Sequence, residues 1–293
     1  MHALGIGEIL WDLIGGSEYL GGAVLNFSVQ LSRLGHRVSF VSAVGDDARG
    51  GRALAQARDL GLSTRFIRTV GDRATGIVTV TVDAGGQPSY VIHRPAAYDF
   101  AALEEPDFAA LGSPPPDWIA FGTLFSMHPH ARQLLRTVIQ RFPQARRFYD
   151  INLRRDSYTP ELVSSLCEFA NVVKLNDVEV GMVGQMFSRP ETTTEAFCRS
   201  YAARFGWQAV CVTRGSEGCA LLLAGEYLEL PGYRVKVADT VGAGDAFAAA
   251  LVHGIHAGWP AHQVGDFANR LGALVASRRG GVPEWTLEEF PKR

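Results

Sequence analysis

One short segment combines small residues, a carboxylate and the start of a helix. In VGAGDAF, Gly242, Ala243 and Gly244 precede Asp245, and a run of apolar helix formers follows at once. Small residues leave backbone N–H groups accessible, and the first N–H groups of a helix lack intrahelical partners, so such a turn can bind an anion. A carboxylate in a first helical turn is favourable in any protein, so a plain helix cap is the simpler interpretation. The functional interpretation is a phosphate cradle with a base beside it.

Other phosphate-binding sequences are missing from the chain. A Walker A loop needs a lysine after a glycine, but the three lysines, Lys174, Lys236 and Lys292, follow other residues. The HRD and DFG motifs of protein kinases are absent, and GIGEIL lacks the third glycine of a dinucleotide fingerprint. If the chain handles ATP, we expect backbone amides to hold the phosphoryl group without a lysine clamp, and a carboxylate to activate the acceptor hydroxyl.

Strand-like and helix-like segments alternate along most of the chain. Apolar strands are expected at ALGIGEIL, RVSFVSAVG, DWIAFG, RRFYDIN, NVVKLN and QAVCVTRG, with helical segments between them and over 244–258. This alternation predicts one α/β domain over residues 1–293, with a mainly parallel sheet covered by helices on both faces. Ligands of such sheets bind at the carboxyl ends of the strands.

One segment departs from the alternation. Residues 75–94 alternate at period 2 on both sides of the glycine-containing turn DAGGQ, which predicts a β-hairpin. Outside the main sheet, this hairpin could form a small lid together with about residues 13–20, or it could be a surface ribbon without function. Arg94 ends the hairpin and could reach a sugar or its phosphate, or point into solvent.

Composition excludes several classes of protein. Hydrophobic residues make up 47% of the 293 residues, as in ordinary globular proteins, and the net charge of −2 argues against nucleic acid as a partner. No apolar run has the length of a membrane span, and the N-terminal segment lacks the basic start of a signal peptide. The four cysteines have no disulfide or metal-ligand spacing, which favours a cytoplasmic protein.

Two long segments resemble the signatures of the PfkB, or ribokinase-like, carbohydrate kinases. DTVGAGDAFAAAL is similar to the C-terminal signature of that family, and GGAVLNFSVQLSRLGHRVSFVSAVGDDARGGRAL to its N-terminal signature. TGIVTVTVD, DINLR, KLNDVE and VTRGSEG lie between them and resemble family segments in the expected order. The resemblance covers nearly the whole chain and implies a ribokinase-like three-layer α/β/α fold with a small β-hairpin lid. GEILWD, GGAVLN and DINLR are similar to the fructokinase-like branch.

The resemblance implies roles in phosphoryl transfer from ATP to a sugar. It makes Asp245 the catalytic base, and Gly242, Ala243 and Gly244 part of the anion hole. The residues expected at the sugar are Asp12, Gly22 and Asn26 by resemblance, with Arg94, Asn152 and Arg154 as further candidates. The residues implied to lie beside the nucleotide are Asn176, Glu179, Thr213, Gly215, Gly218 and Asn269.

The resemblance also implies metal ions. Glu179 is implied to hold Mg²⁺ through water, and the loop that begins at Asp239 and Thr240 to hold a monovalent cation such as K⁺ through its carbonyls. RRGGVPEW replaces the usual segment near this loop, which leaves the cation in question.

Simpler explanations exist for several of these residues. Asp12 could be a turn aspartate after the first strand, and Asn26 could lie on a helix surface. Arg154 could pair with Asp150 instead of a phosphate.

The sequence therefore predicts an ATP-dependent sugar kinase, with fructose as the expected substrate. Only eight residues separate Asp12 from Gly21, and RDSYTPE follows NLR where a typical fructokinase has a longer segment, so alternatives to fructose stay open. The alternatives are a related kinase for ribose, 2-keto-3-deoxygluconate or a nucleoside, and a non-catalytic sugar or nucleotide sensor. The expected partners are the sugar, ATP and, through the lid, a second copy of the chain, with no nucleic acid and no membrane.

Overall fold

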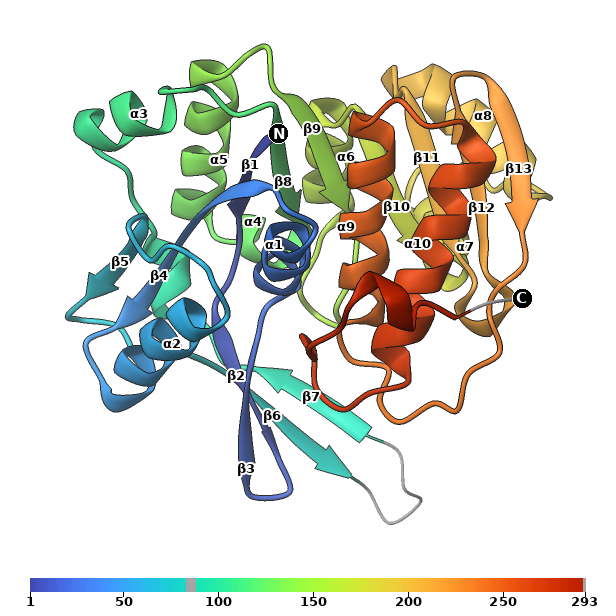
Figure 1. Ribbon diagram of the computed structural model, residues 1–293. Helices are drawn as coiled ribbons and strands as arrows, with labels where there is room; N and C mark the ends of the chain where they lie inside the picture. The colour runs from blue at the N-terminus through green and yellow to red at the C-terminus, as the bar shows by residue number, and fades with distance from the viewer. Residues whose placement is uncertain (83–87, 292–293) are drawn as a thin grey trace.

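A nine-stranded sheet forms the centre of the protein in a computed structural model that describes residues 1–82 and 88–291 (Figure 1). The strand order is β13-β12-β11-β10-β9-β8-β1-β4-β5. The strands from β5 to β11 pair in parallel, whereas β12 and β13 add an antiparallel ribbon at one edge. Their bounds are β1 His2–Ile6, β4 Arg37–Gly45, β5 Ile67–Val70, β8 Trp118–Gly122, β9 Arg146–Asp150, β10 Val172–Asn176, β11 Ala209–Thr213, β12 Cys219–Leu223 and β13 Glu226–Leu230.

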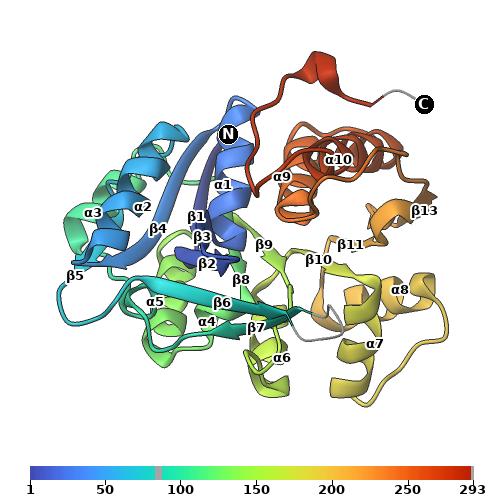
Figure 2. The ribbon, with the colours of Figure 1, turned by 90° about the horizontal axis from the view of Figure 1, so that it is seen from below.

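Helices cover both faces of this sheet, which confirms the predicted three-layer arrangement (Figure 2). One face carries α1 (Ala23–Arg33), α9 (Ala243–His256) and α10 (Ala261–Ala276), and the other carries α5 (Pro129–Arg141), α6 (Pro160–Phe169) and α8 (Thr194–Phe205). Every residue of β1 and β8 is buried. Strands covered on both faces need apolar side chains at successive positions, which is why they appear in the sequence as continuous apolar runs.

The remaining helices are short or lie at the edges of the layers. They are α2 (Ala48–Asp59), α3 (Glu105–Leu111), α4 (Thr123–Ser126) and α7 (Asp177–Met186), with 3-10 turns at Ala97–Phe100, Gly215–Glu217 and Leu287–Glu289. In the part of the chain that the structure describes, none of the helices has the length and apolar character needed to cross a membrane.

A second, four-stranded sheet lies beyond the carboxyl end of β1 (Figure 1). This lid sheet has the order β3-β2-β6-β7, formed by β2 (Leu10–Ile14), β3 (Ser17–Gly21), β6 (Gly76–Val82) and β7 (Pro88–Ile92). β6 and β7 form an antiparallel pair, and β2 pairs in parallel with β6. The turn expected at residues 83–87 lies outside the described residues.

The first strand is shorter than the sequence predicts. ALGIGEIL was expected to form one strand, but β1 ends at Ile6, and Gly7–Ile9 carries the chain from the main sheet to the lid sheet. Asp12 therefore lies in the middle of β2, not in a turn after β1. The Gly7 N–H still donates to the Val41 carbonyl, at 3.2 Å, before the backbone leaves the main sheet.

Candidate active site

The turn from Gly242 to Asp245 begins α9 at the carboxyl edge of the main sheet. Gly242 has φ 77°, and a Cβ at this residue would lie 1.9 Å from the Gly281 carbonyl oxygen. The Ala243 N–H donates to the Thr240 carbonyl at 3.3 Å. Within the described residues the N–H groups of Gly244 and Asp245 have no protein acceptor. Free donors at the start of a 14-residue helix, where the helix dipole is positive, can hold an anion.

Asp245 has the proton affinity of a base that works near neutral pH. Its Oδ2 accepts a hydrogen bond from Asn26 Nδ2 at 2.8 Å. Burial raises the pKa of Asp245 to about 7, the Asp150 charge adds to the rise, and Asn26, Lys174 and Arg154 oppose it. General bases are most effective when their pKa lies close to the working pH.

The start of α1 aims Asn26 at this carboxylate. Gly22 has φ 137°, and a Cβ there would lie 2.2 Å from the Glu8 carbonyl oxygen. The Glu8 side chain caps the helix in place of a side chain at Gly22, because its Oε1 accepts the Ala23 N–H at 2.9 Å. Asn26 is buried, and its Oδ1 has no hydrogen-bond partner among the described residues, so the side chain has an unused acceptor beside the Asp245 carboxylate.

Asp12 lies in the lid sheet within electrostatic range of the same site. Gly21 of β3 pairs with Leu10 of β2, and a Cβ at Gly21 would lie only 2.7 Å from Asp12 Oδ2. The glycine therefore leaves room for the Asp12 carboxylate. Burial raises the pKa of Asp12 to about 6, whereas the Arg154 charge lowers it. Arg154 also lowers the pKa of Asp245, so the exposed Arg154 guanidinium lies within electrostatic range of both carboxylates.

Arg94 and Asn152 have different surroundings. The Arg94 guanidinium forms an ion pair with buried Asp99 and donates to the Leu124 carbonyl at 2.6 Å, so it braces the end of β7. Asn152 follows β9 with φ 39°, a backbone conformation that asparagine adopts more readily than most residues. Asp150, which could have paired with Arg154, binds Lys174 instead.

The Asn176–Glu179 motif joins two loops at the carboxyl edge. Asn176 Oδ1 accepts the Glu179 N–H at 2.9 Å and caps α7, and Glu179 Oε2 accepts the Asn176 N–H at 2.8 Å. Glu179 Oε1 accepts the Leu153 N–H at 2.7 Å. Both carboxylate oxygens thus hold backbone, which fixes the loop after β9 against the end of β10.

The residues expected beside the nucleotide lie around the ends of β11 and β13. Thr213 ends β11, and Gly215 follows it with φ 55°. Gly218 has φ 94°, and a Cβ there would lie 2.1 Å from the Leu230 carbonyl oxygen at the end of β13. Asn269 of α10 is buried and donates to the Pro231 carbonyl at 3.3 Å, so it holds the loop after β13.

Residues 280–285 form a strap across the site. The two oxygens of Asp239 accept hydrogen bonds from the N–H groups of Val241 and Gly280, both at 3.0 Å. These bonds hold the strap against the loop that contains Asp239 and Thr240. A Cβ at Gly281 would lie 3.1 Å from Asn26 Nδ2. The strap also reaches α1, where Trp285 Nε1 donates to Gln30 Oε1 at 2.6 Å.

Sequence reasoning assigned no role at the site to three buried charged residues, Glu8, Asp150 and Lys174. Lys174 and Asp150 form an ion pair with an Nζ–Oδ2 distance of 2.9 Å. The available signal was a lysine inside the apolar segment NVVKLN, because a lysine in a strand buried on both faces requires a partner.

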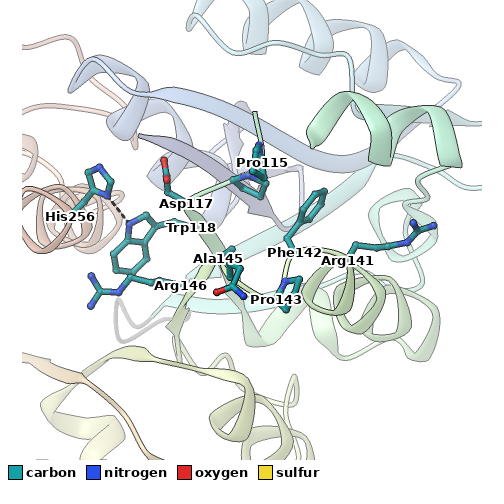
Figure 3. A pocket seen from close by; sticks show the side chains of 11 residues that line it. Pro115, Asp117, Trp118, Arg141, Phe142, Pro143, Ala145, Arg146 and His256 are labelled. Carbon is teal, nitrogen blue, oxygen red and sulfur yellow. Dashed lines mark hydrogen bonds between the residues drawn. The ribbon is translucent and has the colours of Figure 1, made fainter. Parts of the chain in front are cut away.

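Two hollows differ in their relation to this site. The hollow in Figure 3, of about 460 Å³, is lined by Asp117, Trp118 and Arg146 at the amino ends of β8 and β9 and by His256 at the end of α9, so it lies away from Asp245. A second hollow, of about 450 Å³, lies between β7 and the loops that follow β8 and β9. Only the second one is at the carboxyl edge, where the candidate site is.

Activity is expected to fall as pH decreases through 7. With Asp245 as the expected base, its raised pKa leaves it protonated below about pH 7 and ionised above it, so kcat/KM for the expected sugar substrate should rise from pH 5.5 to 8 with one ionisation near 7. A pH-independent rate over this range would contradict the assignment.

Thermal unfolding at each pH is the control for that profile. Burial lowers the pKa of His36 to about 4, so its stabilising effect is complete above the usual value of 6.5 and declines as pH falls below it. Tm values measured between pH 5.5 and 8 separate this loss of stability from the titration of the base.

Gly242→Ala is expected to abolish most turnover. The added Cβ would overlap the Gly281 carbonyl at a positive φ, so the turn must open and its N–H donors move, with a loss in kcat of about 10²-fold. Gly258→Ala at the other end of α9 is the matched control, because Gly258 has φ 71° but open space around its Cβ. Both variants should lose stability, but a similar loss of turnover in Gly258→Ala would contradict the argument.

Comparisons with known proteins match almost the whole chain. A family model described as pfkB family carbohydrate kinase matches residues 14–286. A protein of Pyrococcus horikoshii described as a sugar kinase is 28% identical over 94% of this chain and 90% of its own length. Its crystal structure in complex with ATP has a TM-score of 0.81, is 26% identical and covers 96% of this chain and 94% of that chain.

Two further matches also cover more than nine-tenths of both chains. A fructokinase of Vibrio alginolyticus is 28% identical over 94% of this chain and 93% of its own length. An Escherichia coli protein described as ribokinase II, solved in complex with ATP and Mg²⁺, has a TM-score of 0.81 and is 25% identical over 96% of this chain and 94% of that chain.

Proposed function

Because the chain belongs to the PfkB family of carbohydrate kinases, we propose that it transfers the γ-phosphoryl group of ATP to a hydroxyl group of fructose. ATP-dependent phosphorylation of a carbohydrate follows from the family, and fructose is the proposed acceptor. The fructokinase of V. alginolyticus and the fructokinase-like segments GEILWD, GGAVLN and DINLR support this choice.

The observation that carries the proposed chemistry is the 2.8 Å hydrogen bond between Asn26 and Asp245. These residues are far apart in the sequence, and the contact joins the start of α1, expected at the sugar, to the base at the phosphate-binding turn. Asp12 approaches the same region from the lid sheet. We propose that Asp12, Gly22, Asn26, Asn152 and Arg154 surround the sugar, and that Arg94 acts on it indirectly by holding the end of β7.

In the proposed reaction, the sugar hydroxyl oxygen attacks the γ-phosphorus in line with the bond that breaks. The proton of the hydroxyl passes to Asp245, a bond forms between the sugar oxygen and phosphorus, and ADP leaves with the bridging oxygen. The N–H groups of the Gly242–Asp245 turn hold the charge on the transferred group, so fixed dipoles and positioning supply most of the rate.

Metal ions fit this arrangement through water or through carbonyl groups. In the described part of the chain, no three His, Cys, Asp or Glu side chains form a group that could hold a metal. The proposed Mg²⁺ would therefore be held mainly by nucleotide phosphates and water. Glu179, together with Asn176, would hold Mg²⁺ through water, and the ion would reduce the charge on the phosphates. Carbonyl groups of the loop at Asp239 and Thr240 would hold the proposed K⁺. Thr213, Gly215, Gly218 and Asn269 are proposed to surround the nucleotide.

The lid sheet is proposed to close over the sugar and to exclude water from the reaction. Ile14, Tyr19 and Val91 of this sheet are exposed apolar side chains, and its edges β3 and β7 have unpaired sides. Pairing with a second chain would cover them, so a homodimer through the lid is part of the proposal. The four free, buried cysteines support a cytoplasmic location.

A coupled assay of ADP release tests the substrate. Fructose should give the highest kcat/KM in a panel that includes ribose, 2-keto-3-deoxygluconate and a nucleoside, each measured against ATP without acceptor. A higher value for another acceptor would replace fructose but leave the kinase unchanged. ADP release that no acceptor stimulates would favour the sensor alternative.

A further inference from the structure

Lys174 and Asp150 form a buried ion pair between neighbouring strands. Lys174 lies in β10 and Asp150 ends β9, and each is 6% exposed. The Lys174 Nζ donates to both carboxylate oxygens, at 3.0 Å to Oδ1 and 2.9 Å to Oδ2. Burial alone would lower the pKa of the Lys174 ammonium, but the Asp150 charge and hydrogen bonds outweigh burial and raise the pKa, so Lys174 is charged at neutral pH.

Stability alone does not account for this pair. Removing two charges from water costs several kcal/mol per ion, and apolar replacement of such pairs is often neutral or stabilising. The buried neighbours of these two residues within the strands, Phe148 and Tyr149 of β9 and Val173 and Leu175 of β10, are apolar or aromatic, so an apolar pair would suit the same positions. The location of the charges therefore points to function.

The Lys174 ammonium lies beside Gly244, in the turn at the start of α9. A Cβ built at Gly244 would lie 3.7 Å from Lys174 Nζ, and among the described residues no other atom outside α9 lies within 4 Å of that point. Asp150 accepts from Nζ at two oxygens, which holds the ammonium at the turn. The chain thus has a lysine at its phosphoryl site, brought there by the sheet and not by a glycine-lysine sequence.

Four residues from separate elements act on the Asp245 carboxylate. Asn26 of α1, Lys174 of β10 and Arg154 after β9 favour the ionised carboxylate, and Asp150 at the end of β9 disfavours it. The two members of the ion pair thus have opposite effects on Asp245. Replacing the two members one at a time should therefore move the pKa of Asp245 in opposite directions.

We propose that Lys174 is an electrostatic component of the phosphoryl-transfer site, held there by Asp150 as a positioning residue. As the sugar oxygen bonds to phosphorus and the bond to the bridging oxygen breaks, the Lys174 charge stabilises the negative oxygens of the transferred group at the turn. The same charge keeps Asp245 ready to take the hydroxyl proton. This inference rests on the proposed role of Asp245 as base.

The test compares Lys174→Met with Asp150→Asn. Both substitutions break the same ion pair, but Lys174→Met should move the acid limb of the kcat/KM profile to higher pH and Asp150→Asn to lower pH, each by about one unit. Lys174→Met should also lower kcat by about 10- to 100-fold with KM for the sugar nearly unchanged. Lys174→Arg, which retains the charge, should restore part of the turnover.

Arg68→Met is the matched control for the loss of an ion pair. Arg68 of β5 pairs with Asp107 of α3 at 2.6 Å, outside the site, so its replacement should shift neither the acid limb nor kcat. Shifts of the acid limb in the same direction for Lys174→Met and Asp150→Asn, or no shift in either, would overturn the inference.

A double variant keeps the test decisive if Lys174→Met does not fold. Lys174→Met with Asp150→Asn leaves no unpaired buried charge, and it should fold and still lose kcat about 10-fold or more. Full turnover in the double variant would show that the pair is structural. Full turnover in Asp245→Asn would instead show that Asp245 is not the base. Failure of the inference on Lys174 and failure of the proposed function therefore give different results.

Discussion

Replacement of Asp245 by asparagine is expected to lower kcat by about 10²-fold or more, with ATP binding and fold retained. An amide has the same shape as the carboxylate and can still bond to Asn26, but it cannot accept the hydroxyl proton at neutral pH. Because a carboxyl group with a pKa raised by burial is removed, Tm should stay the same or increase. Initial rates and nucleotide titrations measure the two effects separately.

Asp177→Asn is the matched control for this substitution. Asp177 is also an aspartate in the first turn of a helix at the same edge of the sheet, but it is exposed, and its Oδ1 accepts only the neighbouring Val178 N–H at 3.0 Å. Turnover should be nearly unchanged in this variant. Near-normal turnover in Asp245→Asn would exclude Asp245 as the base.

Asp12→Ala is expected to raise KM for the sugar by about 30- to 1,000-fold while KM for ATP stays within about twofold. Hydrogen bonds to a charged group contribute about 1.5–3 kcal/mol each and do not add fully, so two sugar hydroxyls bound by Asp12 correspond to about 2–4 kcal/mol. Titration of the sugar at saturating ATP, and of ATP at saturating sugar, measures the difference.

Glu18→Gln provides the control on the same sheet. Asp12 faces Tyr19, and Leu13 faces Glu18, across β2 and β3, so Asp12 and Glu18 project from opposite faces. Glu18 pairs with Arg49 and Arg52 of α2, which ties the lid sheet to the main body. If Glu18→Gln changes the sugar KM as much as Asp12→Ala, movement of the lid sheet and not direct binding is responsible.

The sequence was sufficient for the layers and for the main strands. The apolar segments at β8, β9, β10 and β11 and the glycine turn before α9 predicted a parallel sheet with helices on both faces, and the structure confirms it. The ribbon of β12 and β13 was missed. Its turn places Ala224 and Gly225 at φ 52° and 84°, and alanine at a positive φ gives no turn signal of the kind that asparagine or glycine gives.

The sequence indicated individual candidate residues for the site, but it did not indicate which of them are in contact. The resemblance pointed to Asn26 and Asp245, whereas their hydrogen bond depends on how α1 packs on α9, which no local pattern encodes. Lys174 was passed over because a lysine was sought next to a glycine in the sequence. The sheet instead brings Lys174 to Gly244 across a distance in the chain that motif spacing cannot express.

The strap at residues 280–285 is synthesised after the turn at Gly242 that it supports. The turn at Gly242 rests on the Gly281 carbonyl, and the loop at Asp239 on the Gly280 N–H, so a nascent chain that ends before residue 280 has the base but not the support of its turn. Phosphoryl transfer should therefore begin only after the ribosome has released the strap, when the sheet and lid are already made.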